Sequence, residues 1–147
     1  MNLIKESNRD HGNAFTKNVA HYLAQQGVNL QPEYSVSVGL DSTYKKQHRF
    51  DLGSPSVLVE CKYYDWTEGG HNPSAKLSTL NEAMMLFYAA PAQYRKLLFI
   101  AKTVKKGVRQ PETLAEYYIR LHQPFIPDDV EVWEFDNSTL QARKLRG

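Results

Sequence analysis

Two carboxylates and a lysine lie close together in the segment HRFDLGSPSVLVECK, between apolar stretches of the chain. Asp51 precedes Glu60 by nine positions, and Lys62 follows two residues after Glu60. Paired carboxylates repel each other and are costly to bury unless a cation neutralises them. Mg2+ prefers oxygen ligands, so its candidate ligands are Asp51, Glu60 and the backbone carbonyl of Cys61. These residue types predict a metal-dependent site that acts on phosphodiester bonds.

The lysine completes a possible catalytic set. Lys62 carries a compact positive charge that can orient an attacking water or neutralise charge in the transition state. The predicted catalytic residues are therefore Asp51, Glu60 and Lys62, with Mg2+ as the cofactor and Mn2+ as a possible substitute. The alternative is that the three side chains form an ordinary ion-pair cluster on the surface.

Two short strands and a turn must position these side chains. Asp51 lies near the end of one strand, residues 58–62 read as a buried strand, and Gly-Ser-Pro-Ser at 53–56 supplies the turn. Side chains alternate along a strand, so Glu60 and Lys62 point the same way, while Val57, Val59 and Cys61 face the opposite, apolar side. Pairing of the two strands as a hairpin would bring Asp51 beside Glu60.

The remaining pattern predicts an α/β protein in a single domain, residues 1–147. Phe15, Val19, Tyr22 and Leu23 have helical spacing, and residues 97–101 form an apolar run typical of a central strand. The expected order is helix, three strands, helix, strand, helix, strand, in a central mixed sheet flanked by helices. The predicted elements outside the hairpin are a helix over 12–27, a strand over 34–40, a helix from Asn72 and Pro73 to a break at Pro91, a strand over 97–101, a helix over 111–121 and a strand over 130–135.

The spacing of Asp51, Glu60, Cys61 and Lys62, an aspartate followed after eight residues by Glu-Cys-Lys, resembles the PD-(D/E)XK signature of the restriction-endonuclease-like nucleases. The first residue of that signature is often proline and is Phe50 here. The resemblance implies a restriction-endonuclease-like core. It also implies that the acidic pair binds Mg2+ and that the lysine assists hydrolysis of DNA.

The segment over residues 12–27 is similar to the opening helix of Mrr-like and resolvase-like members of that superfamily. Many of them carry a glutamate directly after the phenylalanine, where this chain has Thr16. A hydroxyl does not replace a metal-binding carboxylate. A further acidic ligand would have to come from Glu6, Asp10 or Asp41, or be absent.

Composition fits one globular domain. The chain has 147 residues, of which 41% are hydrophobic and 12% aromatic, enough for one core. No apolar run is long enough to span a bilayer and no secretory hydrophobic region is present, so we expect a cytoplasmic protein without membrane contact. The single cysteine, Cys61, excludes an intramolecular disulfide and a Cys-rich zinc site. We interpret it as a small buried hydrophobic residue rather than a nucleophile.

Basic residues cluster on both sides of the motif, although the net charge of the chain is only +2. If these clusters flank a carboxylate-lined cleft they can hold phosphates, and otherwise they are solvated loop charges. Arg143, Lys144 and Arg146 are expected in a frayed tail. The candidate DNA-binding residues are Lys45, Lys46, Arg49, Lys76, Lys102, Lys105 and Lys106.

Several other side chains have a functional and a structural interpretation. Tyr63, Tyr64 and Trp66 continue the strand after Lys62 and either stack on bases or pack in the protein, and packing is favoured. His48 and His71 are either general bases or metal ligands, or else surface or structural residues, and the second interpretation is favoured because no pair has ligand spacing. The loop over residues 65–73 is rich in turn residues and could close over a substrate.

Two classes of function follow. The first is a metal-dependent endodeoxyribonuclease, and the second is a catalytically weak or inactive DNA-binding protein of the same fold. Intact Asp51, Glu60 and Lys62 favour the enzyme, whereas Thr16 favours the alternative. Cutting both strands of a duplex needs two sites, so we expect a homodimer, with an interface at the aromatics near Tyr64 and Trp66 or at the helix over 111–121.

Overall fold

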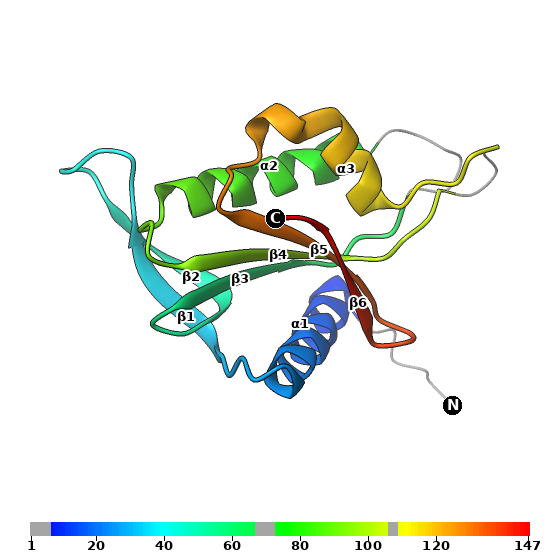
Figure 1. Ribbon diagram of the computed structural model, residues 1–147, viewed down its shortest axis with the longest axis horizontal. Helices are drawn as coiled ribbons and strands as arrows, with labels where there is room; N and C mark the ends of the chain where they lie inside the picture. Colours follow the sequence, from blue (N-terminus) through cyan, green and yellow to red (C-terminus); the bar gives the residue numbers. More distant parts are fainter. Residues whose placement is uncertain (1–6, 67–72, 106–108) are drawn as a thin grey trace.

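The chain forms a six-stranded mixed sheet with helices on both faces (Figure 1). This computed structural model describes residues 7–66, 73–105 and 109–147. The predicted order of helices and strands is confirmed, and a short 3-10 helix and a last strand are added to it. In chain order the elements are α1 (Asn8–Gln25), β1 (Gln31–Val38), β2 (Lys46–Gly53), β3 (Val57–Lys62), α2 (Ser74–Ala89), β4 (Arg95–Ala101), α3 (Leu114–His122), the 3-10 helix η2 (Gln123–Phe125), β5 (Val130–Asp136) and β6 (Gln141–Arg146).

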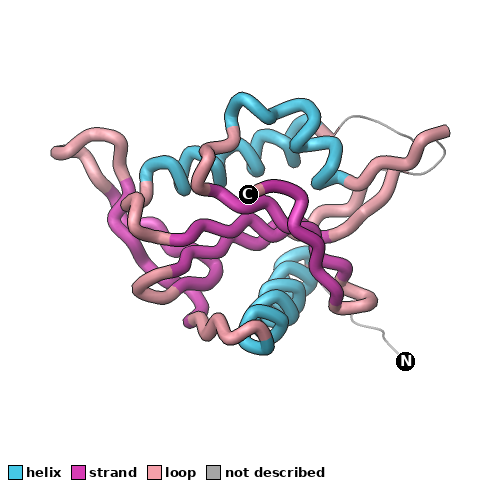
Figure 2. The backbone as a smooth tube through the Cα atoms, in the orientation of Figure 1, coloured by secondary structure: helices cyan, strands magenta, loops and turns pink. Residues whose placement is uncertain are grey.

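The strands follow one another across the sheet in sequence order, from β1 at one edge to β6 at the other. β3, β4 and β5 run parallel, whereas β1, β2 and β6 pair antiparallel with their neighbours. Parallel strands require crossover connections, and here α2 and α3 lie in those connections on one face of the sheet. Helix α1 covers the other face (Figures 1 and 2). The central mixed sheet flanked by helices is therefore confirmed.

The middle strands are apolar on both faces because helices cover both. Leu58 and Leu98 are fully buried in the cluster beneath α2 and α3, whereas Val59 and Leu97 are buried in the cluster beneath α1. Glu60 directly follows the two apolar positions of β3, Leu58 and Val59. Its carboxylate therefore sits at the border of the core rather than on an open surface.

Helix α1 begins earlier than the apolar pattern predicted, because a capping box lies upstream of residue 12. The Ser7 side chain accepts a hydrogen bond from the Asp10 backbone N–H at 3.2 Å, and the Asp10 carboxylate accepts one from the Ser7 backbone N–H at 3.2 Å. Gly27 follows the helix with a φ of 84°, a left-handed conformation that glycine adopts without strain.

Helix α3 begins later than predicted, at Leu114 rather than at Pro111. Thr113 and Glu116 form a second capping box, in which the Thr113 hydroxyl accepts from the Glu116 N–H at 3.2 Å and Glu116 accepts from the Thr113 N–H at 3.0 Å. These reciprocal bonds satisfy backbone donors at the first turn. They therefore set the start of the helix more strongly than the proline does.

Helix α2 buries the predicted stripe of Leu77, Leu80, Met84 and Phe87. It begins at Ser74 with Pro73 as the N-cap residue, and Asn72 lies outside the described residues. The stripe packs on the same face of the sheet toward which Glu60 and Lys62 alternate.

Two expectations about strand ends are wrong. β1 ends at Val38, and Leu40 is 65% exposed rather than buried, because the chain turns away where the Gly39 N–H donates to the Ala89 carbonyl at 3.0 Å. The expected frayed tail is instead strand β6, paired antiparallel with β5. Arg143 donates to Glu134 at 2.8 Å, and Arg146 donates to the Ile126 carbonyl at 3.0 Å.

The aromatic residues after Lys62 do not continue the strand, because β3 ends at Lys62. Tyr63 packs beside Phe15 with ring centroids 5.6 Å apart, and Trp66 is only 7% exposed and lies 5.1 Å from the Tyr117 ring. The packing interpretation of these aromatics is confirmed. Trp66 is therefore not an exposed residue for an interface.

Candidate active site

The two carboxylates lie where strands β2 and β3 separate. The antiparallel ladder between these strands contains the pairs Leu52 with Val59 and Gly53 with Leu58. Beyond this short ladder β2 continues beside β1, while β3 continues beside β4. Asp51 and Glu60 occupy the first position past the ladder, so their side chains meet at a fork in the sheet.

Reciprocal hydrogen bonds join the two strands at this fork. The Cys61 backbone N–H donates to Asp51 Oδ2 at 2.7 Å, and the Asp51 backbone N–H donates to Glu60 Oε1 at 3.3 Å. Each carboxylate thus accepts a backbone donor of the other strand, in the place where a ladder carbonyl would normally do so. These bonds hold the two carboxylates side by side without another ion.

An irregularity in β2 turns Asp51 toward β3. Phe50 packs in the cluster beneath α2, whereas Leu52 packs in the cluster beneath α1, although residues two apart on a regular strand share a face. On β1, Glu33 lies opposite Asp51 between the registered pairs, and its φ is 53°. Such irregularities bend a strand and redirect its side chains. Here the irregularity directs the Asp51 carboxylate along the sheet toward Cys61.

Burial favours the protonated forms of both carboxyl groups, and at Glu60 the charge of Asp51 adds to this effect. Burial, and then the charge of Asp51, raise the pKa of Glu60 to about 8, and its residue is 5% exposed. Burial also raises the pKa of Asp51, against the opposing effects of the Cys61 N–H and of the Lys62 and His48 charges. The site therefore favours a bound positive charge near neutral pH.

Lys62 lies close enough to act on both carboxyl groups. Its charge lowers the pKa of Asp51 and that of Glu60. Among the described residues, no direct ion pair joins Lys62 to either group. Because Glu60 is buried and Lys62 forms no direct ion pair with either carboxylate in the described part of the chain, the interpretation of the three as an ordinary surface ion-pair cluster is wrong.

His48 belongs to the site, although its spacing gave no such indication. Its Nε2 lies 3.3 Å from Glu60 Oε1, and its ring meets the edge of the Phe50 ring at a centroid distance of 4.6 Å. In an unbroken hairpin register His48 would stand opposite residue 63, three positions from Glu60. The irregularity at Asp51 brings His48 to Glu60 despite this offset. Periodicity alone does not predict this contact.

The further acidic residues proposed from the sequence are used elsewhere. Asp10 belongs to the cap of α1, Asp41 accepts from the Thr43 N–H at 2.6 Å within a turn, and Glu6 lies outside the described residues. Glu82 of α2 was not expected, yet its charge raises the pKa of Glu60 and that of His48. Glu82 is therefore a further acidic residue whose charge acts on the site.

Thr16 and Cys61 contact each other beneath the fork. The Thr16 hydroxyl donates to the Gly12 carbonyl at 3.0 Å, and the Thr16 side chain also hydrogen-bonds the Cys61 thiol. Burial raises the pKa of that thiol well above its usual value, so the thiol is neutral and a poor nucleophile. The helix position without a carboxylate therefore adjoins the site.

The donor set suits a hard divalent cation. The hydrogen bonds of the described residues engage Asp51 Oδ2 and Glu60 Oε1, which leaves Asp51 Oδ1 and Glu60 Oε2 for another partner. In the described part of the chain, no three or more His, Cys, Asp or Glu side chains are grouped as metal ligands. Mg2+ is commonly held by one or two carboxylates with waters, so the two carboxylates fit it.

The basic residues that precede Asp51 in the chain lie in the loop between β1 and β2 and on β2 itself. Lys45, Lys46 and Arg49 are exposed, and the Lys45 ammonium reaches the Gly39 carbonyl at 3.5 Å. The charge of Lys46 lowers the pKa of His48, which places Lys46 within electrostatic reach of the site. Arg49 pairs with Ser35 on β1. Because neighbouring residues on a strand point to opposite faces, Arg49 and His48 are expected on opposite faces of β2.

The candidate DNA-binding residues that follow Lys62 in the chain are used in several ways. Lys76 donates to the Asp65 carbonyl, and the Lys105 ammonium lies 5.9 Å from the Trp66 ring centroid. Lys102 is exposed and lines a polar pocket of about 570 Å³. Lys106 lies outside the described residues. His71 and residues 67–72 of the expected loop also lie outside them. Of the predicted DNA-binding residues that the structure describes, Lys45 and Lys46 line one hollow and Lys102 lines another.

Comparison of the chain with family models, with curated proteins and with solved structures finds no match. None of the helices in the described ranges is both long and apolar enough to cross a bilayer. The functional assignment therefore depends on the geometry at the fork.

Proposed function

We propose that this chain is a divalent-cation-dependent endodeoxyribonuclease with a restriction-endonuclease-like core. The observation that carries the proposal is the pair of buried carboxylates at the fork between β2 and β3, held by reciprocal backbone hydrogen bonds with Lys62 nearby. The element order supports the fold assignment, with β6 as an addition at the sheet edge.

Asp51 and Glu60 would hold Mg2+ or Mn2+, with the Cys61 carbonyl as a third oxygen ligand. Such an ion lowers the pKa of a water and stabilises negative charge on a phosphate. The chain's own groups prepare the site for it. The Cys61 N–H fixes one oxygen of Asp51, while the Asp51 N–H and His48 fix one oxygen of Glu60.

Lys62 contributes at the substrate. Its ammonium group lies on the face of β3 that carries Glu60, at the strand end, where a phosphate next to the carboxylates would meet it. A positive charge in a partly desolvated site stabilises the transition state more than the ground state. His48 acts as a positioning residue through Glu60 and has no assigned contact with DNA.

A catalytically weak DNA-binding protein is the second candidate. It is favoured by Thr16, which adjoins Cys61 and supplies a hydroxyl where a carboxylate could complete the cation site. On this alternative, DNA binding and cation binding persist, whereas turnover is lost.

We expect cleavage of plasmid, linear or branched DNA in the presence of Mg2+ or Mn2+, and none in the presence of a chelator. Asp51→Asn should abolish it, because an amide has no charge to hold the ion. The control is Asp128→Asn, which neutralises an exposed carboxylate outside the site. DNA binding without cleavage under every condition would favour the second candidate, and cleavage that survives Asp51→Asn would refute the site.

A further inference from the structure

An exposed apolar surface lies on the outer side of α2. Five of the eight exposed large hydrophobic side chains in the described residues belong to it, and they are 56% to 81% exposed. Large contiguous apolar patches on a soluble protein mark interaction sites. We call this surface the α2 face, and it consists of Leu40, Tyr44, Met85, Tyr88 and Phe125.

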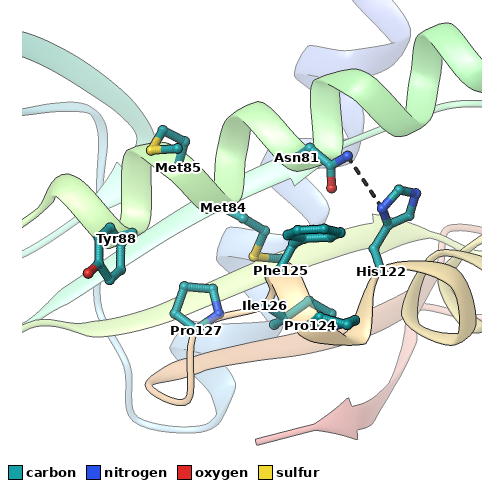
Figure 3. A pocket seen from close by; sticks show the side chains of 9 residues that line it. All are labelled: Asn81, Met84, Met85, Tyr88, His122, Pro124, Phe125, Ile126 and Pro127. Carbon is teal, nitrogen blue, oxygen red and sulfur yellow. Dashed lines mark hydrogen bonds between the residues drawn. The ribbon is translucent and has the colours of Figure 1, made fainter.

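Two adjoining hollows make the α2 face continuous. One, of about 480 Å³, lies between α2 and the β1–β2 loop and includes Leu40 and Tyr44 in its walls. The other, of about 440 Å³, lies between α2 and the segment around η2 and includes Tyr88 and Phe125 (Figure 3). Met85 lines both hollows and therefore lies at the centre of the face.

The border of the α2 face carries charges of both signs. Glu82, Lys45 and Lys46 line the same hollow as Leu40 and Tyr44. In the part of the chain that the structure describes, none of the three forms an ion pair. Glu82 would repel a polyanion at this surface, whereas charges of both signs can pair with each other across a self-complementary twofold interface.

The positions of these charges fit a twofold axis. The Gly39 N–H bonds to the Ala89 carbonyl, so the loop before Lys45 lies at the C-terminal end of α2, while Glu82 lies about 10 Å earlier along the helix axis. If two α2 helices cross antiparallel at Met85, Glu82 of each copy lies beside the C-terminal end of the other α2. That end carries Lys45 and Lys46 of the second copy.

We propose that the α2 face is the docking site of a second copy of this chain, which forms a symmetric homodimer with Met85 at its centre. This interface replaces the one expected near Trp66, which is buried. It assigns Lys45 and Lys46 to the interface with the second copy. The docking depends on neither the cation nor DNA cleavage, so it can be tested apart from the proposed function.

Sedimentation velocity of the full chain, without metal or DNA, tests the docking. We expect a mass that approaches twice 16.9 kDa as the concentration rises into the high micromolar range. Met85→Glu should weaken association about tenfold or more, because it places a charge at the apolar centre. The control is Leu140→Asn, which removes an exposed leucine near the β5–β6 turn, where φ is 61° and asparagine is tolerated.

Charge reversal tests the geometry. Glu82→Lys and Lys46→Glu should each weaken association, and the double variant should restore it, because both symmetric pairs are then reversed together. A wild type that stays monomeric at every concentration would overturn the proposal and leave the α2 face to another molecule. Association that Met85→Glu leaves unchanged would also overturn it.

Discussion

Lys62→Ala is expected to reduce metal-dependent DNA cleavage by at least about 10²–10³-fold while folding and DNA binding remain near wild type. Lys62 is half-buried at the end of β3 and acts on both carboxyl groups through its charge. Its contribution should be made mainly to the transition state, where the phosphate gains negative charge. Single-turnover cleavage rates and equilibrium DNA affinity, measured on the same preparation, separate the two effects.

Two further variants sharpen this result. Lys62→Arg keeps the positive charge but changes its geometry and should recover only part of the rate. Lys17→Ala removes an exposed lysine of α1 and should leave the rate unchanged. If Lys62→Ala cleaves DNA at the wild-type rate with Mg2+, the catalytic assignment of this lysine is wrong.

Glu60→Gln is expected to stabilise the metal-free protein at alkaline pH by an amount on the order of a few kcal/mol. Burial and Asp51 raise the pKa of Glu60 in the folded state to about 8, from the ordinary 4.5. Between these two values the folded state holds a proton that the unfolded state has released, so the free energy of unfolding falls as pH rises. This loss in the free energy of unfolding is complete above about pH 8, where Glu60 is ionised in the folded state as well.

Urea unfolding with a chelator at pH 4, 6 and 9 should therefore show a difference between Glu60→Gln and wild type that grows with pH. Added Mn2+ should stabilise wild type at pH 9 and have little effect on Glu60→Gln, because the amide is a weaker ligand. Asp128→Asn serves as the control for loss of an exposed carboxylate. A difference that does not vary with pH would contradict the assigned burial of charge at Glu60.

The sequence predicted the order of elements because the apolar patterns are strong. The continuous apolar run of β4 and the stripe Leu77, Leu80, Met84 and Phe87 are buried as expected. Helix starts were less predictable, because both α1 and α3 begin at capping boxes that lie outside their apolar stripes. β6 was missed because it is a charged edge strand, without the alternation that a buried face imposes.

The site was predictable in its carboxylates but not in its surroundings. A hairpin register was enough to place Asp51 opposite Glu60, whereas the direction of the Asp51 carboxylate toward Cys61 depends on the irregularity in β2. The contact between His48 and Glu60 depends on the break in alternation between Phe50 and Leu52, which leaves no periodic signal. The electrostatic effect of Glu82 on the site depends on how α2 packs over the sheet, a tertiary contact that local pattern does not encode.

Calorimetric titration of the wild type and of Asp51→Ala with Mn2+ tests most directly whether the fork between β2 and β3 is a cation site. We predict a saturable binding event for the wild type near neutral pH that is lost in Asp51→Ala, while both proteins give the same circular dichroism spectrum. Equal binding of Mn2+ by the two proteins would contradict the assignment of the site.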